Sequence, residues 1–443
     1  MTREMKNSGI EWIGDIPSEW KIRKIKYILH ERNEKNNPIK SDNILSLTAS
    51  QGVIPYAEKE GGGNKPKEDL SAYKLAYPND IVMNSMNILS GSVGLSKYFG
   101  CVSPVYYMFY SDNENINIKY FHYIFQTSVF QKSLMGLGNG ILIKETENGK
   151  LNTIRMRIPL EKLNGLLLPI PDKEEQKQIV DSLEHIIPQI DIIISETKAS
   201  IENYKEYKQS VITEAVTKGL DENMPMKDSG IKWIGEIPVN WRLGKIKSCV
   251  TKVGSGKTPK GGGDVYSSEG VLFLRSQNVY DTGLVLDDPA YISEEIDEEM
   301  KNTRVMDKDV LLNITGGSIG RCCIYDKSYG KANVNQHVSI IRLKQDIMFP
   351  EYMHYYWLSS LGKMSVNLYQ TGGNREGMSA DAIKNSPIIY TSISTQKEII
   401  AFLDSKCAEI DNIILEKEKL ITNLEEYKKS LIYEYVTGKK SVK

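Results

Sequence analysis

One stretch of this sequence is written twice, and the repeat limits the folds open to the chain. SGIEWIGDIPSEW at Ser8–Trp20 returns as SGIKWIGEIPVNW at Ser229–Trp241. Each copy is followed by a variable block and then by a long stretch of helical periodicity, which opens at Gln176 in the first half and at Gln396 in the second. A repeat of this length is too long for a solenoid unit and has the size of a domain. The chain is therefore predicted to be a duplicated domain.

The variable blocks predict an α+β fold. Short β-rich runs are broken by clusters of Gly, Asn, Ser and Pro, and one helical pattern interrupts them in each block. A chain of 443 residues is long enough for two separate cores. We divide it into a first globular domain over residues 1–170, a first spacer helix over 171–220, a second globular domain over 221–391 and a second spacer helix over 392–443.

The two long helical stretches carry the apolar pattern of a coiled coil, with steps of four and three residues. At about 1.5 Å per residue, roughly 40 residues reach about 60 Å. Pro188 predicts a kink in the first helix. Two repeats related by a two-fold axis would run their helices antiparallel. The predicted packing positions are Ile179, Leu183, Ile186, Ile190 and Ile193, then Ile399, Leu403, Ile410, Ile413, Leu420, Leu424 and Leu431.

The charges of the chain are informative only locally. The net charge is −1, so the field of the whole molecule argues neither for nor against a nucleic-acid partner. Two segments are nevertheless strongly basic. KIRKIKYILHER, from Lys21 to Arg32, contains one acid, and RLGKIKSCVTKVGSGKTPKGGG, from Arg242 to Gly263, contains none.

The sequence lacks the complete motifs of several classes of enzyme. GSGKT at Gly254–Thr258 lacks the first glycine of a phosphate loop, and Pro259 with a glycine triplet stands where the helix should begin. Asp172, Glu175 and Lys177 have the letters of a nuclease site, but acids at the start of a helix favourably meet its amide dipoles. We find neither the glycine-rich cofactor turn nor the catalytic string of a base methyltransferase. No enzymatic activity is expected, and the histidines show no metal-ligand spacing.

Compartment follows from what the sequence lacks. No run approaches the roughly 18 apolar residues of a membrane span, and Met1–Ile10 is polar. The five cysteines show no CxxC spacing, which argues against a metal site or disulfides and fits a reducing compartment. The expected location is the cytoplasm.

The loops of both blocks are rich in side chains that can read DNA. Arg matches guanine, and Asn or Gln matches adenine, because their donors and acceptors fit the base edge in the major groove. The same residue types also make turns, so that alternative stays open for each of them. The candidates in the first block are Thr48, Ser50, Gln51, Lys65, Lys67, Asn84, Asn87, Ser90, Ser92 and Asn139; those in the second are Lys257, Lys260, Arg275, Gln277, Asn278, Asn313, Thr315, Ser318, Arg321, Asn333, Asn335, Gln336, His337, Asn374 and Arg375.

Over almost its whole length the chain resembles the specificity subunits of type I restriction-modification systems. The resemblance rests on the repeated WIGxIPxxW boxes at Trp12 and Trp233 and on strings such as LRSQN, DVLLNITGGSIGR and QTGGNREGMSADAIKNSPI. It also rests on the matching ends of the helices, EYKQSVITEAVTKG at Glu206–Gly219 and EYKKSLIYEYVTGK at Glu426–Lys439.

The resemblance implies a subunit without catalytic activity of its own. Each block would be a target-recognition domain that reads one half of a split, asymmetric DNA site. The helices would pack antiparallel, space the domains and dock methyltransferase subunits, two of them being expected, and restriction and translocase subunits would join them. S-adenosylmethionine, ATP and Mg would belong to those partners. The competing hypothesis is a protein-protein adaptor with two tethered domains and no DNA contact, and the salt dependence of DNA binding discriminates the two hypotheses.

Overall fold

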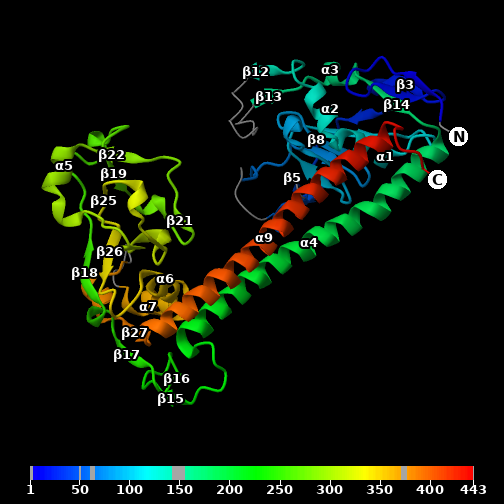
Figure 1. Ribbon diagram of the computed structural model, residues 1–443. Coiled ribbons are helices and arrows are strands. Elements are labelled where there is room, and N and C mark those ends of the chain that lie inside the picture. The colour runs from blue at the N-terminus through cyan, green and yellow to red at the C-terminus, as the bar shows by residue number, and fades with distance from the viewer. Residues whose placement is uncertain (1–2, 49–50, 60–64, 142–154, 371–376, 443) are drawn as a thin grey trace. The chain divides into compact units, whose positions relative to one another are not determined.

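The chain divides into two compact units. The computed structural model describes residues 3–48, 51–59, 65–141, 155–370 and 377–442. Unit 1 joins Met1–Thr197 to Lys419–Lys443, and unit 2 is Lys198–Glu418. Both divisions fall inside the long helices, α4 over Lys173–Lys218 and α9 over Ile393–Val436, so each unit holds one globular part and a section of both helices (Figure 1).

Unit 1 is built around an antiparallel sheet in the order β4-β11-β8-β9. Its core packs the apolar face of this sheet against α1, which follows the cap at Asn117, and against both long helices. The sheet strands are β4 (His30–Arg32), β11 (Tyr106–Tyr110), β8 (Ile81–Asn84) and β9 (Val93–Leu95). The paired strands around them are β1 (Met5–Asn7) with β2 (Asp15–Pro17), β3 (Lys21–Lys24) with β14 (Leu167–Ile170), β5 (Leu45–Thr48) with β6 (Gly52–Pro55), β7 (Lys74–Ala76) with β10 (Gly100–Val102), and β12 (Asn139–Ile141) with β13 (Arg155–Arg157). The short helices are α1 (Ile118–Gln126), α2 (Ser128–Ser133) and α3 (Leu160–Asn164).

Unit 2 repeats this plan with additions. Its antiparallel sheet, β18-β26-β23-β24, has the same connections as the sheet of unit 1. A second sheet, β22-β19-β25, contains the parallel pair β19 and β25. The strands are β15 (Met226–Asp228), β16 (Glu236–Pro238), β17 (Arg242–Lys245), β18 (Val250–Ser255), β19 (Val271–Leu274), β20 (Val279–Tyr280), β21 (Gly283–Leu284), β22 (Ala290–Ile292), β23 (Val310–Asn313), β24 (Cys322–Ile324), β25 (Ala332–Val334), β26 (Val338–Leu343) and β27 (Pro387–Tyr390). The helices are α5 (Glu294–Glu299), α6 (Pro350–Leu358), α7 (Ser360–Tyr369) and α8 (Ala380–Asn385).

The sections of α4 and α9 run antiparallel in each unit, as predicted, and an ion pair at matching repeat positions joins them. In unit 1, Lys428 Nζ lies 2.6 Å from Asp191. In unit 2, Lys208 Nζ lies 2.7 Å from Asp411. The helix α4 continues through Pro188. One series of buried and half-buried side chains along each helix steps by four and three, as a coiled coil requires. In α4 they are Leu183, Ile187, Ile190, Ile194, Thr197, Ile201, Tyr204 and Lys208, and in α9 they are Leu403, Cys407, Ile410, Ile414, Lys417, Ile421, Leu424, Lys428, Leu431 and Tyr435.

Two predicted packing positions are wrong. Ile193 and Leu420 are each 44% exposed, and their neighbours Ile194 and Ile421 take the inward positions. Ile186 and Ile413 are half-buried beside the seam, while Ile179, Ile399 and the remaining predicted positions pack inward.

Each repeated box closes over the glycine that ends a long helix. Trp241 covers Gly219, whose left-handed conformation (φ 80°) terminates α4, and an added Cβ there would lie 3.0 Å from the indole. Trp20 covers Gly438 in the same way, at the end of α9 (φ 73°). Both tryptophans are buried, so they act as packing anchors. Unit 1 is therefore completed by the last residues of the chain, and Figure 1 shows both chain ends at this place.

Hydrogen bonds to and from the end of α9 secure this closure. Tyr120 Oη donates to Val436 O at 2.8 Å, as Tyr352 Oη does to Val216 O at 3.1 Å in unit 2. Lys439 Nζ donates to Ile13 O at 2.6 Å. The two units thus have equivalent contacts at the ends of their long helices as well as equivalent sheets.

Candidate nucleic-acid interface

A chain of polar side chains crosses the loops of unit 2 at one end of its sheet. Thr258 Oγ1 donates to Gln336 Oε1, Gln336 Nε2 lies 2.9 Å from His337 Nε2, and Thr315 Oγ1 lies 2.6 Å from His337 Nδ1. We call these four residues the His337 network. They come from the loops that follow β18, β23 and β25, and Gln336 and Thr258 are exposed. The network therefore presents hydroxyl, amide and imidazole groups from three loops on one surface.

A glycine holds the Lys257 loop against this network. Gly256 lies so close to the β25–β26 connection that an added Cβ would be 1.8 Å from Val334 O and 2.4 Å from Asn335 O. The amide of Lys257 donates to Val334 O at 3.3 Å. The glycine of the GSG string thus allows two backbone segments to approach closely. The chain after β18 forms a loop and a short 3-10 turn, and not the helix that a phosphate loop requires.

We expect Gly256→Ala to detach this loop, because the added methyl group cannot fit between the two backbones. Hydrogen exchange at Lys257 should become about ten to a hundred times faster, the effect of losing about 1–3 kcal/mol of local stability. Hydrogen-exchange mass spectrometry of peptides spanning residues 252–262 measures it. Gly254→Ala is the matched control, since a Cβ at Gly254 would meet no atom within 4 Å. Equal exchange in both variants would contradict the close approach.

The other cationic candidates of unit 2 are partly occupied within the protein. Arg275 Nη2 lies 3.1 Å from the Asp288 carboxylate, which also accepts from Gln277 Nε2 at 3.3 Å. Arg321 stacks over the ring of Tyr280 at 4.8 Å. Stacking on an aromatic ring fixes an arginine in one orientation and leaves its donors outward. Arg321 is thus the better placed of the two arginines, while Arg275 would have to leave an acid to meet a base.

Four predicted readers of unit 2 are buried, and we withdraw them from the interface. Asn313 is fully buried and donates to Ser276 O at 2.8 Å. Asn333 is also fully buried and donates to Asp297 at 3.0 Å. Such amides satisfy backbone and carboxylate groups of the core, which would otherwise lose hydrogen bonds on burial. The other two asparagines close local turns. Asn278 donates to Val285 O, and Asn335 accepts from the His337 amide.

Unit 1 brings two of its predicted loops together. The β5–β6 hairpin carries Thr48 and Gln51, and it packs against β9, where a Cβ at Gly94 would lie 3.0 Å from Gly52 Cα. β9 follows the loop from Asn84 to Ser92, which Asn84 organises by accepting from the Met86 amide at 3.0 Å. Asn87 and Ser90 are exposed on this loop. This surface of unit 1 combines threonine and glutamine with asparagine and serine, whereas the His337 network combines threonine and glutamine with histidine.

The remaining candidates lie elsewhere. Lys65 and Lys67 are exposed beyond this pair of loops, Asn139 lies on β12, and Lys260 and Ser318 lie in the loops near the His337 network. Ser50, Asn374 and Arg375 fall outside the described residues. Prediction from the residue types missed Thr258 and the stacking ring of Tyr280; the run of polar residues through Lys257 and Thr258 is the signal that could have found the first.

The buried Cys322 and His354 are a structural pair. Cys322 Sγ lies 3.3 Å from His354 Nδ1. Burial raises the pKa of the Cys322 thiol well above its ordinary value and lowers the pKa of His354, so each is held in its neutral form. Nucleophilic catalysis needs the thiolate, so this pair is not poised for it. Within the described ranges, no three His, Cys, Asp or Glu side chains gather as a metal site requires.

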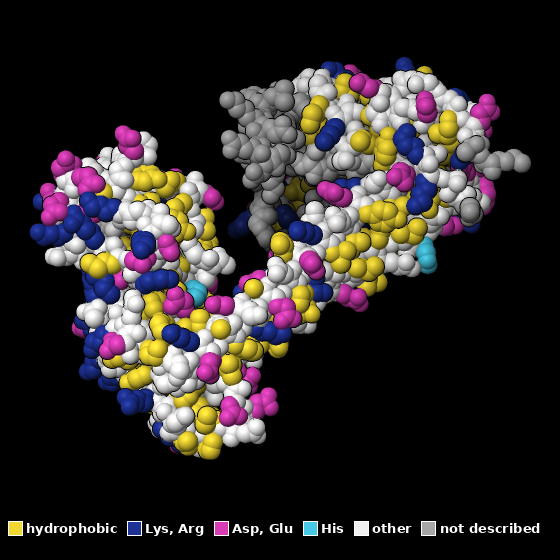
Figure 2. All heavy atoms as spheres, viewed as in Figure 1, with side chains coloured by type: hydrophobic (Ala, Val, Ile, Leu, Met, Phe, Trp, Pro, Cys, Tyr) yellow, Lys and Arg dark blue, Asp and Glu magenta, His cyan; other side chains and the backbone are white. Residues whose placement is uncertain are grey.

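Positive charge gathers over one part of unit 2. Figure 2 shows Lys and Arg side chains over β17 and β18, the strands that precede the Lys257 loop. None of the helices in the described part of the chain is both long and apolar enough to cross a lipid bilayer.

The comparisons with known proteins agree on one family. The sequence pattern of the type I restriction modification DNA specificity domain matches residues 17–203 and again residues 238–426. The MjaVIII specificity subunit of the type I restriction enzyme of Methanocaldococcus jannaschii is 23% identical over 436 residues, which cover 97% of this chain and 94% of that protein.

Solved structures share the fold. A chain from work on complex assembly and conformational transition of the type I R-M system matches with a TM-score of 0.72 at 12% identity, covering 96% of this chain and 99% of that one. The HsdS subunit from Thermoanaerobacter tengcongensis matches with a TM-score of 0.52 at 13% identity, covering 96% and 98%. Since the family pattern matches twice and spans most of the sequence, this chain belongs to the family of type I restriction modification DNA specificity proteins.

Proposed function

We propose that this chain is the DNA sequence-recognition subunit of a type I restriction-modification complex, and that each globular domain reads one half of a bipartite, asymmetric DNA site. The observation that carries the proposal is one scaffold with two different polar surfaces. The sheets β4-β11-β8-β9 and β18-β26-β23-β24 share their connections, yet one surface offers Thr48, Gln51 and Asn87 and the other the His337 network.

Different polar surfaces on equivalent sheets imply that the two halves of the DNA site have different sequences. Two identical subunits related by a two-fold axis would require a palindrome. A duplicated chain escapes this limit, because its two surfaces can change independently while the sheets and joints stay the same. The helices would then space the two domains and supply a platform for partner subunits.

The chemistry would lie with the partners. We propose that this chain is not an enzyme and that S-adenosylmethionine, ATP and Mg²⁺ bind to methyltransferase and restriction subunits. The purified chain should neither hydrolyse ATP nor transfer methyl groups to DNA, and assembly with the methyltransferase subunits should restore transfer. Either activity in the chain alone would overturn this part of the proposal.

Lys257 and Lys260 test the DNA interface. Alanine at both positions should weaken binding of the assembled complex to its target duplex and flatten the salt dependence, by about 0.9 in slope for each phosphate that is no longer neutralised. Binding titrations at several salt concentrations measure both quantities. Methylation mapping of DNA from the source cell supplies the duplex, since it yields both half-sites and their spacing. An adaptor that does not touch DNA would show unchanged binding and slope.

Two exposed tyrosines mark the place where we expect methyltransferase subunits to dock. Tyr207 in unit 2 is 48% exposed and Tyr427 in unit 1 is 51% exposed, and both stand in the repeated Glu-Tyr-Lys string of the long helices. Exposed apolar residues on the same helices accompany them, Ile192, Ile193 and Leu420 in unit 1 and Phe402 and Leu415 in unit 2. Figure 2 shows hydrophobic side chains along the helices. Equivalent sites in the two units favour two such partners.

Truncating these tyrosines should separate the two docking events. Tyr207→Ala and Tyr427→Ala should each weaken one partner by about 2 kcal/mol, roughly thirtyfold, as for a central aromatic side chain of an interface. Native mass spectrometry should then show complexes with one methyltransferase subunit for each single variant. Tyr329→Ala is the control, because this tyrosine is similarly exposed at 42% but lies away from the helices. Full assembly of the double variant would contradict the proposal.

A further inference from the structure

A short basic turn is present in the same form in both units. Lys24-Ile25-Lys26 enters the 3-10 turn η1 (Ile25–Tyr27), and Lys245-Ile246-Lys247 enters η4 (Ile246–Ser248). The isoleucine is fully buried in each turn. Its amide donates to the residue that precedes the pairing strand, Leu166 O at 2.9 Å in unit 1 and Ser386 O at 3.0 Å in unit 2. We call these segments the Lys-Ile-Lys turns.

Packing accounts for the isoleucines and leaves the lysines unexplained. All four lysines are exposed. Within the described residues, none of them has a carboxylate at ion-pair distance, and the one ring contact among them is Lys26 Nζ at 4.8 Å from the centre of Tyr27. An exposed, unpaired lysine contributes little to folding. Its presence at the same two positions of both turns therefore points to a ligand that both units share.

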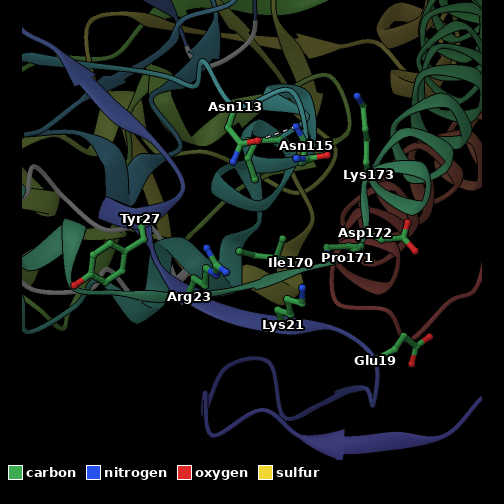
Figure 3. A pocket seen from close by; sticks show the side chains of 11 residues that line it. Glu19, Lys21, Arg23, Tyr27, Asn113, Asn115, Ile170, Pro171, Asp172 and Lys173 are labelled. Atoms are coloured by element: carbon green, nitrogen blue, oxygen red, sulfur yellow. Dashed lines mark hydrogen bonds between the residues drawn. The ribbon is translucent and has the colours of Figure 1, made fainter.

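A further cation stands three residues before each turn, Lys21 in unit 1 and Arg242 in unit 2. Figure 3 shows Lys21 and Arg23 side by side on β3, where they line a hollow of about 350 Å³ that Glu19 and Asp172 also line. Arg242 lines the matching hollow of unit 2, of about 330 Å³, together with Asp346. The positive charge therefore extends from each turn along the strand that precedes it.

In unit 2 the turn leads along one strand to the surface proposed for base reading. In unit 2 the turn is followed by β18, the edge strand of the sheet, and the far end of β18 is followed by Gly256 and Lys257. Six residues of strand at about 3.3 Å each give about 20 Å. That length corresponds to roughly six nucleotides of one DNA strand at about 3.4 Å each. In unit 1 the turn leads in the same way to β4, the edge strand of the equivalent sheet.

We propose that the two Lys-Ile-Lys turns bind phosphate groups of the DNA backbone beside each half-site, without reading its sequence. The inference rests on the proposed function. The base-reading surfaces of the units differ, so a contact that is the same in both must meet what unlike half-sites have in common, and that is the phosphodiester backbone. An acidic face of a partner protein is the competing ligand. The lysines favour DNA because they continue the basic strands toward the reading loops, whereas the long helices offer apolar side chains.

The experiment neutralises the four lysines together, as Lys24→Gln, Lys26→Gln, Lys245→Gln and Lys247→Gln, in the chain assembled with its methyltransferase subunits. Binding to the target duplex and to a duplex of unrelated sequence is measured from low to high salt. We expect both affinities to fall by the same factor, so that their ratio is unchanged. The salt slope should become shallower by about 0.9 for each phosphate that the variant no longer neutralises.

A second set of four lysines controls for the change in net charge. Lys198→Gln, Lys205→Gln, Lys419→Gln and Lys429→Gln alter exposed lysines of the long helices and should leave affinity and slope unchanged. A lower ratio of specific to unrelated binding in the quadruple variant would assign the turns to base reading and overturn the inference. Loss of assembly at unchanged DNA binding would assign them to a partner protein. If the unaltered complex binds its target no better than unrelated DNA, the proposed function itself fails.

Discussion

Placing aspartate at Leu431 should destabilise unit 1 by at least about 4 kcal/mol, the sum of removing a core leucine and burying an unpaired charge. Leu431 is 1% exposed and belongs to the core that also contains Trp20, Leu183 and Val436. The charge would lie between α4 and α9 and beneath the globular part at once. We expect hydrogen exchange to accelerate throughout unit 1, while peptides from unit 2 keep their protection.

Leu420→Asp is the matched control, since the same change is made on the same helix of the same unit. Leu420 is 44% exposed, so its substitution should change stability by no more than about 0.5 kcal/mol. Urea denaturation of both variants gives the comparison. Equal losses would mean that the inward face of α9 has been assigned to the wrong residues.

Removing the carboxylate of Asp309 should destabilise unit 2 by about 3–5 kcal/mol, because it leaves a partly buried arginine without its partner. Asp309 is fully buried and accepts from Arg342 Nε at 2.8 Å and Nη2 at 2.7 Å. It also accepts from the Met306 amide at 2.7 Å. Burial, and then the charge of Arg342, lower the pKa of the nearby Lys252, and the Asp309 carboxylate opposes this shift.

The test of Asp309→Ala has a built-in rescue. Adding Arg342→Met removes the stranded charge and should recover part of the stability, since an apolar pair of similar volume often replaces a buried ion pair without cost. Asp288→Ala removes an ion pair with Arg275 whose carboxylate is 80% exposed, and it should cost less than about 1 kcal/mol. If thermal unfolding of the Asp309 and Asp288 variants is alike, the buried pair has no special role.

The repeat made the architecture predictable, but it left the register of the helices ambiguous. Runs of adjacent isoleucine and leucine offer two seams one residue apart, at Ile193 or Ile194 and at Leu420 or Ile421. Periodicity cannot choose between such neighbours, because both continue the apolar stripe. The three-dimensional packing chooses Ile194 and Ile421, and the other member of each pair is left on the surface.

The polar loops were the least predictable part, for a physical reason. An asparagine has the same donors and acceptors whether it faces a base or a buried carbonyl group. Asn84 and Asn313 occupy matching places in DIVMN and DVLLN, yet Asn84 is half-buried and organises a loop, while Asn313 is fully buried and ties its strand to Ser276. Whether such an asparagine is half-buried in a loop or fully buried in the core depends on the long-range packing around the end of its strand, which the local sequence does not contain.

The closure of Trp20 over Gly438 has a consequence for the order in which the molecule is made. A ribosome that has released Glu418 has already released every residue of unit 2, whereas unit 1 still lacks the segment that contributes Leu431 and Val436 to its core. At synthesis rates of about 5–20 residues per second, the stretch from Thr197 to this segment takes on the order of ten to fifty seconds. During that time the nascent first domain exposes apolar surface that the end of α9 will later cover, so the half of the protein that is synthesised first is the half that is finished last.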